Sequence, residues 1–175
     1  MDRDRNIALV AIIAAIYALL VYTLPVISFL IFQVRVADAL IPLSMILGTP
    51  AIIGVSIGCF IANIMAPWGS PFLIAIDMLL GSIANAIASW AAMKTNSIKG
   101  KVSPLIRFQL GCSVANLVIT IIVGSYIPIL MNTAFNVPMP LWMGWVGVFL
   151  GEVIAINLVG YLLVFALWKR GISRA

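Results

Sequence analysis

The chain has 175 residues, of which 64% are hydrophobic and 9% are charged, and its formal net charge is +5. Soluble domains contain roughly 45–50% apolar and about 25% charged residues, and a chain of this length could not bury the apolar excess in one water-soluble core. We therefore expect a single integral membrane domain over residues 1–175, without an added soluble domain.

The residue types that carry chemistry exclude several classes of function. Histidine is absent, which removes the most frequent general base and metal ligand. The sequence has no GxxxxGK[ST] phosphate-binding loop. Cys59 and Cys112 lie in apolar runs and form no CxxC pair, so we interpret them as small hydrophobic side chains. We expect no enzyme, no metal site and no cofactor.

The first predicted span covers residues 7–30, with Pro25 near its end. A crossing helix needs about 20 apolar residues, and this run exceeds the roughly 7–15-residue core of a cleaved signal peptide, so we expect a retained helix. A charge-free run then extends from 39 to 76, and its Gly/Pro clusters at 48–50 and 66–71 are turn signals. They predict a second helix at 50–66 and, before it, a short one at 39–48 that is tilted or buried by its neighbours.

Three further spans are predicted at 71–93, 106–130 and 141–168. A basic segment at 94–107 separates the first two, and a polar break at 132–140 separates the last two. The fold class predicted from the sequence is therefore an all-α integral membrane protein, a bundle of six transmembrane helices.

The basic residues test this path, because cytoplasmic loops carry an excess of lysine and arginine. Six crossings place nearly all of them on one side, with only Arg35 toward the other. The residues on the common side are Arg3, Arg5, Lys94, Lys99, Lys101, Arg107, Lys169, Arg170 and Arg174. We predict a multi-pass cell-membrane protein with both termini in the cytoplasm. The positive charge then reflects topology in the lipid bilayer and requires no nucleic acid.

Small residues recur where helices are expected to meet. Such residues let helix backbones approach closely in lipid. GxxxG pairs occur at Gly54–Gly58 and Gly147–Gly151, and the first span carries five alanines at helical spacing: Ala8, Ala11, Ala14, Ala15 and Ala18. These surfaces either pack inside the bundle or, in the first span, dock a different protein, and the sequence leaves both interpretations open.

Four charged residues remain inside or beside the spans: Arg35, Asp38, Asp77 and Glu152. Each charge in the membrane costs at least about 2.5–3.5 kcal/mol on insertion scales, and such residues usually mark a ligand or ion path. The predicted topology places all four in the outer half of the protein. Arg35 and Asp38 could simply pair with each other. The surplus of acids is expensive unless it is protonated or matched by a ligand, so we infer a cationic or strongly hydrogen-bond-donating ligand, or protons.

Four amides lie within the predicted spans, Asn63, Asn85, Asn116 and Asn157, and the first three are candidates for reading the polar edges of a ligand. The alternative is that they join helices by hydrogen bonds. Tryptophans at the predicted outer ends, Trp68, Trp142 and Trp145, suit interfacial anchoring, although one or two could stack on a planar ligand.

Residues 32–40, Phe-Gln-Val-Arg-Val-Ala-Asp-Ala-Leu, resemble the QxRxSEAL signature of the QueT family. Alanine at 37 and aspartate at 38 replace the usual serine and glutamate. The resemblance continues through residues 58–63, 77–82, Asn116, Gly151-Glu152 and Gly160. The family comprises queuosine-precursor transporters, counted among the substrate-binding S components of energy-coupling factor (ECF) transporters.

The resemblance implies a six-helix fold with a site near the outer surface, gated by loops. It implies partners, namely a transmembrane coupling subunit and two cytoplasmic ATPase subunits, with the alanines of the first span at the coupling interface. The implied substrate is a 7-deazaguanine such as preQ1, which carries an aminomethyl cation.

We therefore expect a subunit that captures a small heterocycle through Arg35, Asp38, Asn63, Asp77, Asn85, Asn116 and Glu152. The alternatives are a standalone proton- or cation-coupled carrier using the same carboxylates, and a purely structural membrane subunit.

Overall fold

The computed structural model describes residues 3–29, 33–96 and 103–172. Within these residues the regular structure is helical, and four helices are long and apolar enough to cross a membrane. They are α1 (Arg3–Thr23), α5 (Pro71–Thr95), α6 (Pro104–Phe135) and the segment Leu141–Lys169, which is formed by α7 (Leu141–Glu152), η3 (Val153–Gly160) and α8 (Tyr161–Lys169). The protein is an all-helical membrane protein, as its composition predicts.

Two further apolar helices are shorter: Val36–Leu47 and Thr49–Met65. The first consists of η1, a 3₁₀ helix (Val36–Leu43), and α3 (Ser44–Leu47). The second consists of α4 (Thr49–Ala62) and η2, a 3₁₀ turn (Asn63–Met65). Gly48 separates the two with φ 71°, a conformation that glycine adopts without a steric penalty. The number of crossings therefore stays a prediction of the sequence.

Several helix boundaries differ from the predicted spans. α1 ends at Thr23 rather than near residue 30, because Pro25 disfavours helical geometry at Leu24. The turn α2 (Pro25–Ser28) follows. The short helix begins at Val36 instead of 39, and α6 extends beyond the predicted 106–130 at both ends. Of the residues used for the predicted topology, Leu30, Lys99, Lys101 and Arg174 lie outside the described residues.

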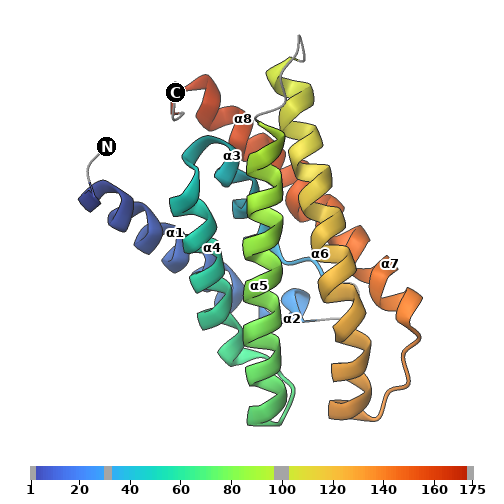
Figure 1. Ribbon diagram of the computed structural model, residues 1–175. Coiled ribbons are helices and arrows are strands. Elements are labelled where there is room, and N and C mark those ends of the chain that lie inside the picture. Colours follow the sequence, from blue (N-terminus) through green and yellow to red (C-terminus); the bar gives the residue numbers. More distant parts are fainter. Residues whose placement is uncertain (1–2, 30–32, 97–102, 173–175) are drawn as a thin grey trace.

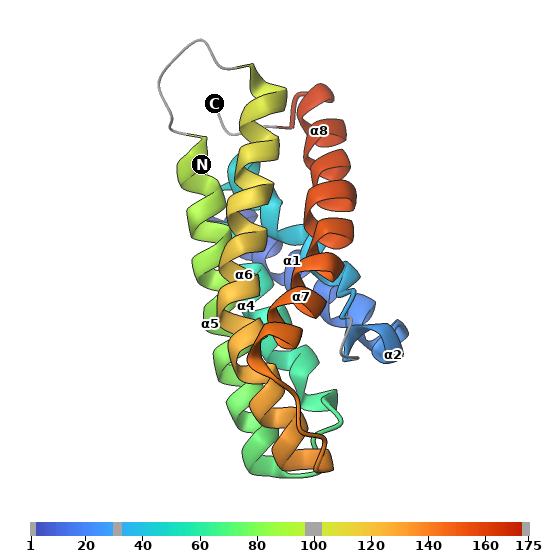
Figure 2. The ribbon, with the colours of Figure 1, turned by 90° about the vertical axis from the view of Figure 1, so that its right-hand side faces the viewer.

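The long helices pack in sequence order, with α1 on α4, α4 on α5, α5 on α6 and α6 on α7. Figure 1 shows α4, α5 and α6 side by side, and Figure 2 shows α8 continuing the line of α7 beside α6. At one end, the lower one in Figure 1, lie the connections between η2 and α5 and between α6 and α7. Lys94, Arg107, Lys169 and Arg170 belong to the opposite end, where α5 and α8 finish and α6 begins.

Glycines set the closest helix contacts. A Cβ added at Gly54 would lie 2.8 Å from Ile13 Cβ, and one at Gly58 would lie 2.6 Å from Tyr17 Cβ. The Gly54–Gly58 pair therefore packs inside the bundle, against α1. Close contact of this kind is the use that small residues have between membrane helices.

The five alanines of α1 divide between two environments. Ala14 and Ala18 are buried against the rest of the chain, whereas Ala8, Ala11 and Ala15 are exposed. Only the latter three remain accessible to another protein.

Candidate functional site

Asp38 lies at the centre of a buried hydrogen-bond network. The Tyr17 hydroxyl donates to Asp38 Oδ1 at 2.5 Å, and Asn85 Nδ2 donates to the same oxygen at 3.3 Å and to the tyrosine hydroxyl at 3.0 Å. Each of the three side chains is at most 2% exposed. The network joins α1, η1 and α5, and it stabilises the carboxylate where no bulk water reaches it.

Asp77 holds a second network, which includes the connection between η2 and α5. Trp68 Nε1 donates to Asp77 Oδ2 at 2.8 Å, and the Tyr126 hydroxyl donates to Oδ1 at 2.7 Å. The Asn63 side chain donates to the Asp77 carbonyl at 3.0 Å. Trp68 is 2% exposed and packs near Phe135, with 6.1 Å between ring centroids. Trp68 therefore does not present its indole to the surface as an interfacial anchor would, because its N–H has a buried carboxylate partner.

Arg35 and Glu152 are buried with unused hydrogen-bonding atoms. Arg35 Nη1 lies 3.7 Å from Cys59 Sγ, and the guanidinium carbon lies 5.4 Å from the centroid of the Phe29 ring. Its Nε and Nη2 have no hydrogen-bond partner, nor does Glu152 Oε2. Glu152 interacts electrostatically with both Arg35 and Asp38. Arg35 thus does not form the simple local pair with Asp38 that their spacing permits.

Glycines and the π-helical segment bring these groups together. A Cβ at Gly81 would lie 2.8 Å from Asn63 Nδ2 and 3.4 Å from the Tyr126 hydroxyl. A Cβ at Gly151 would overlap the backbone carbonyl of Gln33, so Gly151 allows the Arg35 segment to lie against α7. The π-helix η3 begins directly after Glu152, and π-helical geometry is frequent at functional sites.

The site is therefore one buried cluster to which residues from α1 through α7 contribute. It contains six of the seven residues predicted from the sequence: Arg35, Asp38, Asn63, Asp77, Asn85 and Glu152. Three acids accompany a single guanidinium. Among the described residues, no three His, Cys, Asp or Glu side chains are arranged to hold a metal ion. The arrangement suits a polar organic ligand with several hydrogen-bonding groups.

The sequence model of one protein family, described as QueT transporter, matches residues 7–169 and so includes every member of this cluster. The chain belongs to the QueT transporter family. No curated protein and no solved structure matches it significantly. The family establishes a membrane transporter for a small substrate rather than an enzyme.

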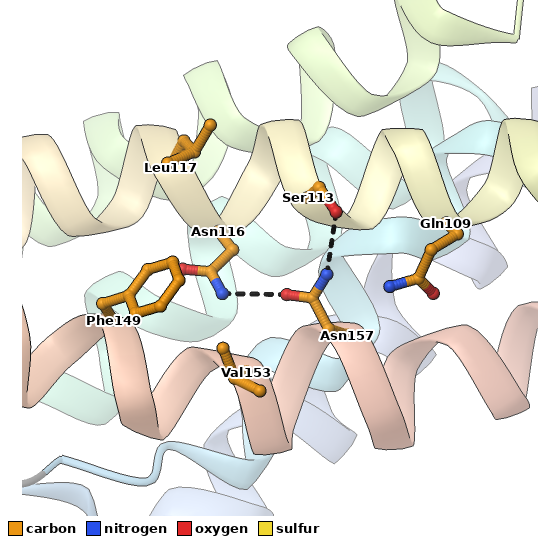
Figure 3. A pocket seen from close by; sticks show the side chains of 7 residues that line it. All are labelled: Gln109, Ser113, Asn116, Leu117, Phe149, Val153 and Asn157. Atoms are coloured by element: carbon orange, nitrogen blue, oxygen red, sulfur yellow. Dashed lines mark hydrogen bonds between the residues drawn. The ribbon is translucent and has the colours of Figure 1, made fainter.

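Asn116, the seventh predicted residue, lies in a different polar cluster of this QueT family member. Its Nδ2 donates to Asn157 Oδ1 at 2.8 Å, and Asn157 Nδ2 donates to Ser113 Oγ at 3.1 Å (Figure 3). Thr120 donates to Asn116 Oδ1 at 3.0 Å. These bonds join α6 to η3. A groove of about 390 Å³ beside them is lined by Gln109, Ser113, Asn116, Leu117, Phe149, Val153 and Asn157. The contacts are those of an amide that joins helices.

Four side chains of the buried cluster around Arg35 were not predicted as site residues: Tyr17, Cys59, Trp68 and Tyr126. A usable signal existed for the tyrosines. Each lies in the middle of an apolar helix, and a buried tyrosine hydroxyl usually finds a polar partner. Cys59 is fully buried, as a small hydrophobic residue would be, but its sulfur also contacts Arg35 and Asn63.

Proposed function

We propose that this QueT family member is the substrate-binding membrane subunit of an energy-coupling factor transporter, and that it captures a small heterocycle. The substrate is a queuosine precursor, a 7-deazaguanine such as preQ1. The observation that carries the proposal is the buried cluster in which Arg35 faces three acids, Asp38, Asp77 and Glu152, each at most 2% exposed.

The charges of the cluster favour a cationic guest. Burying an ionised group without a partner is expensive, and one guanidinium balances only one of three carboxylates. The aminomethyl group of preQ1 supplies a second positive charge and several N–H donors. Asp38 and Asp77, with Asn85 beside them, would accept from these donors. Trp68, in the η2–α5 connection, is buried and bonded to Asp77, and we propose that this connection opens to admit the substrate.

Energy would come from partners, because the chain lacks a phosphate-binding loop. We propose a transmembrane coupling subunit and two cytoplasmic ATPase subunits. The exposed alanines of α1, Ala8, Ala11 and Ala15, would contact the coupling subunit. Such a face permits close approach of a second helix in lipid.

Uptake of labelled preQ1 by cells that otherwise lack it tests this proposal. We expect accumulation only when the chain is co-expressed with a coupling subunit and both ATPases, and none when the ATPases carry inactive phosphate-binding loops. Accumulation by the chain alone, abolished by an uncoupler, would instead establish a standalone proton- or cation-coupled carrier.

Replacing both Ala11 and Ala15 by leucine should weaken association with the coupling subunit at least about tenfold, since each branched side chain adds bulk where the backbones must approach. Ligand binding by the isolated chain should be unchanged, because both positions are exposed. Co-purification measures association, and Ala166→Leu, at an exposed position of α8, is the matched control. Undiminished co-purification of the double variant would move the interface elsewhere.

Both termini are proposed to lie in the cytoplasm, opposite the α6–α7 connection. A membrane-impermeant thiol reagent should label Val137→Cys in intact cells, since Val137 is 44% exposed in that connection. Arg5→Cys and Arg170→Cys should react only after permeabilisation. The native Cys59 and Cys112 are fully buried and give an unlabelled background. Labelling of either terminal cysteine in intact cells would refute the topology.

A further inference from the structure

The buried cluster contains polar atoms that no group of the described chain satisfies. They are Arg35 Nε and Nη2, Asn63 Oδ1 and Glu152 Oε2. Their residues are 2%, 0% and 1% exposed, respectively. A buried polar atom without a partner costs about 1–3 kcal/mol, so native proteins rarely leave several of them in one place. The concentration of four such atoms here indicates that a ligand completes the network.

These atoms lie near one another. Arg35 Nη1 and Asn63 Nδ2 both contact the sulfur of Cys59, at 3.7 Å and 3.8 Å. Glu152 interacts electrostatically with Arg35. The unused atoms of the three side chains thus belong to one buried cluster, as recognition by a single small molecule requires.

The direction of each missing hydrogen bond is fixed by the chemistry of the side chains. Arg35 only donates, and its Nε and Nη2 lie on one edge of the guanidinium, where two parallel N–H groups form a fork. Asn63 presents its nitrogen to the Asp77 carbonyl, which only accepts, so the unused atom of the amide is its oxygen. Glu152 Oε2 accepts when the side chain is ionised, and equally when the proton sits on the other oxygen, toward Asp38. The ligand must therefore accept from Arg35 and donate to Asn63 and Glu152.

Simple ions do not fit this pattern. A carboxylate or phosphate would occupy the Arg35 fork but leave both acceptors unpaired and face three acids. A plain amine would satisfy the acceptors but leave the fork unused. A planar ring that carries an amine and a ring N–H beside a carbonyl or ring-nitrogen acceptor satisfies all of them.

We infer that Arg35, Asn63 and Glu152 read the 2-aminopyrimidinone ring of the substrate, with Glu152 and Asn63 accepting from its amine and ring N–H groups. Asp38 and Asp77 then remain for the cationic substituent. The inference rests on the proposed function and deepens it, because it separates recognition of the ring from recognition of the charge. Glu152 is accordingly a specificity-determining residue rather than a general counter-ion.

Binding of three related probes to the purified full-length chain tests the inference: preQ1, 7-deazaguanine, which lacks the aminomethyl group, and 7-deazahypoxanthine, which also lacks the 2-amino group. The wild-type chain should prefer 7-deazaguanine to 7-deazahypoxanthine by at least about tenfold, because the missing amine leaves a buried acceptor unpaired. Glu152→Met, which keeps the length of the side chain but cannot accept from an amine, should bind the two probes within about threefold of each other.

Two further readouts separate recognition from structure. The preference for preQ1 over 7-deazaguanine should survive in Glu152→Met, because Asp38 and Asp77 are unchanged. The ligand-free variant should melt no lower than the wild type, because the substitution removes a buried carboxyl group whose Oε2 has no hydrogen-bond partner. A purely structural Glu152 would instead lower the melting temperature and weaken all probes alike.

The binding results test the proposed substrate and the role of Glu152 separately. Failure of the wild-type chain to bind any of the three probes would overturn the proposed substrate. Wild-type binding combined with undiminished discrimination by Glu152→Met would overturn only the assignment of Glu152.

Discussion

Arg35→Leu is expected to destabilise the protein by about 3–5 kcal/mol and to abolish substrate binding, because it removes the single cation from a buried cluster of three acids. The guanidinium is 2% exposed, and its electrostatic partners include Asp38 and Asp77. Chemical unfolding in detergent, followed by circular dichroism, measures the stability. Arg5→Leu is the control, since Arg5 is an exposed basic residue whose loss should change stability little.

Arg35→Lys separates the charge from the shape of the guanidinium. Lysine keeps the positive charge but lacks the planar pair of N–H donors. The variant should fold nearly as stably as the wild type yet bind 7-deazaguanine at least about tenfold more weakly. If Arg35→Leu were as stable as the wild type and bound the ligand equally well, the buried charges would have no role in either property.

Gly151→Ala is expected to displace the segment that carries Arg35, and so to impair both stability and binding. The added methyl group would overlap the Gln33 carbonyl and lie 3.2 Å from the Val34 nitrogen. These atoms belong to the backbone, so the clash cannot be relieved by rotating a side chain. Overpacking of this kind costs about 1–3 kcal/mol, and occasionally more. Because Glu152 is the next residue, the shift would also move an acid of the cluster.

Leu150→Ala is the matched control for Gly151→Ala. It lies on the same helix, one residue away, but its side chain is 50% exposed. Thermal unfolding and 7-deazaguanine affinity should both fall in Gly151→Ala and change little in the control. Equal melting temperatures and affinities for Gly151→Ala and the wild type would mean that residues 33–34 can move away without disturbing the site.

The two variants test one physical idea, that the site depends on a segment with little regular structure of its own. Arg35 directly precedes η1 in a non-helical conformation, with φ −86° and ψ 87°. Val34 N donates to the Ile27 carbonyl at 3.0 Å, which ties this segment to α2. The Gln33 side chain donates to the Ser28 carbonyl, and the Gln33 carbonyl lies against Gly151 of α7. The position of the buried cation therefore depends in part on packing against a helix more than 100 residues away in the sequence.

Much of the molecule follows from the sequence alone. The apolar composition requires a membrane environment, because no water-soluble core of this size could bury it. Glycine and proline mark helix boundaries where the backbone geometry requires them, as at Gly48 and Leu24-Pro25. The costly charges mark the buried polar cluster, because selection against unpaired charge in lipid leaves few others. The motif at residues 32–40 was sufficient to identify the family, which the match over residues 7–169 confirms.

Only the tertiary structure decided how these parts combine. The sequence gives no register between α1, η1 and α5, so it could not pair Tyr17 and Asn85 with Asp38. It placed Trp68 at the lipid interface by its position, whereas packing against Phe135 and a bond to Asp77 bury it. It grouped Asn116 with the acids, although the asparagine pairs with Asn157. Composition and spacing are properties of one segment, but a binding site depends on which faces of several helices meet, and that is determined by long-range packing.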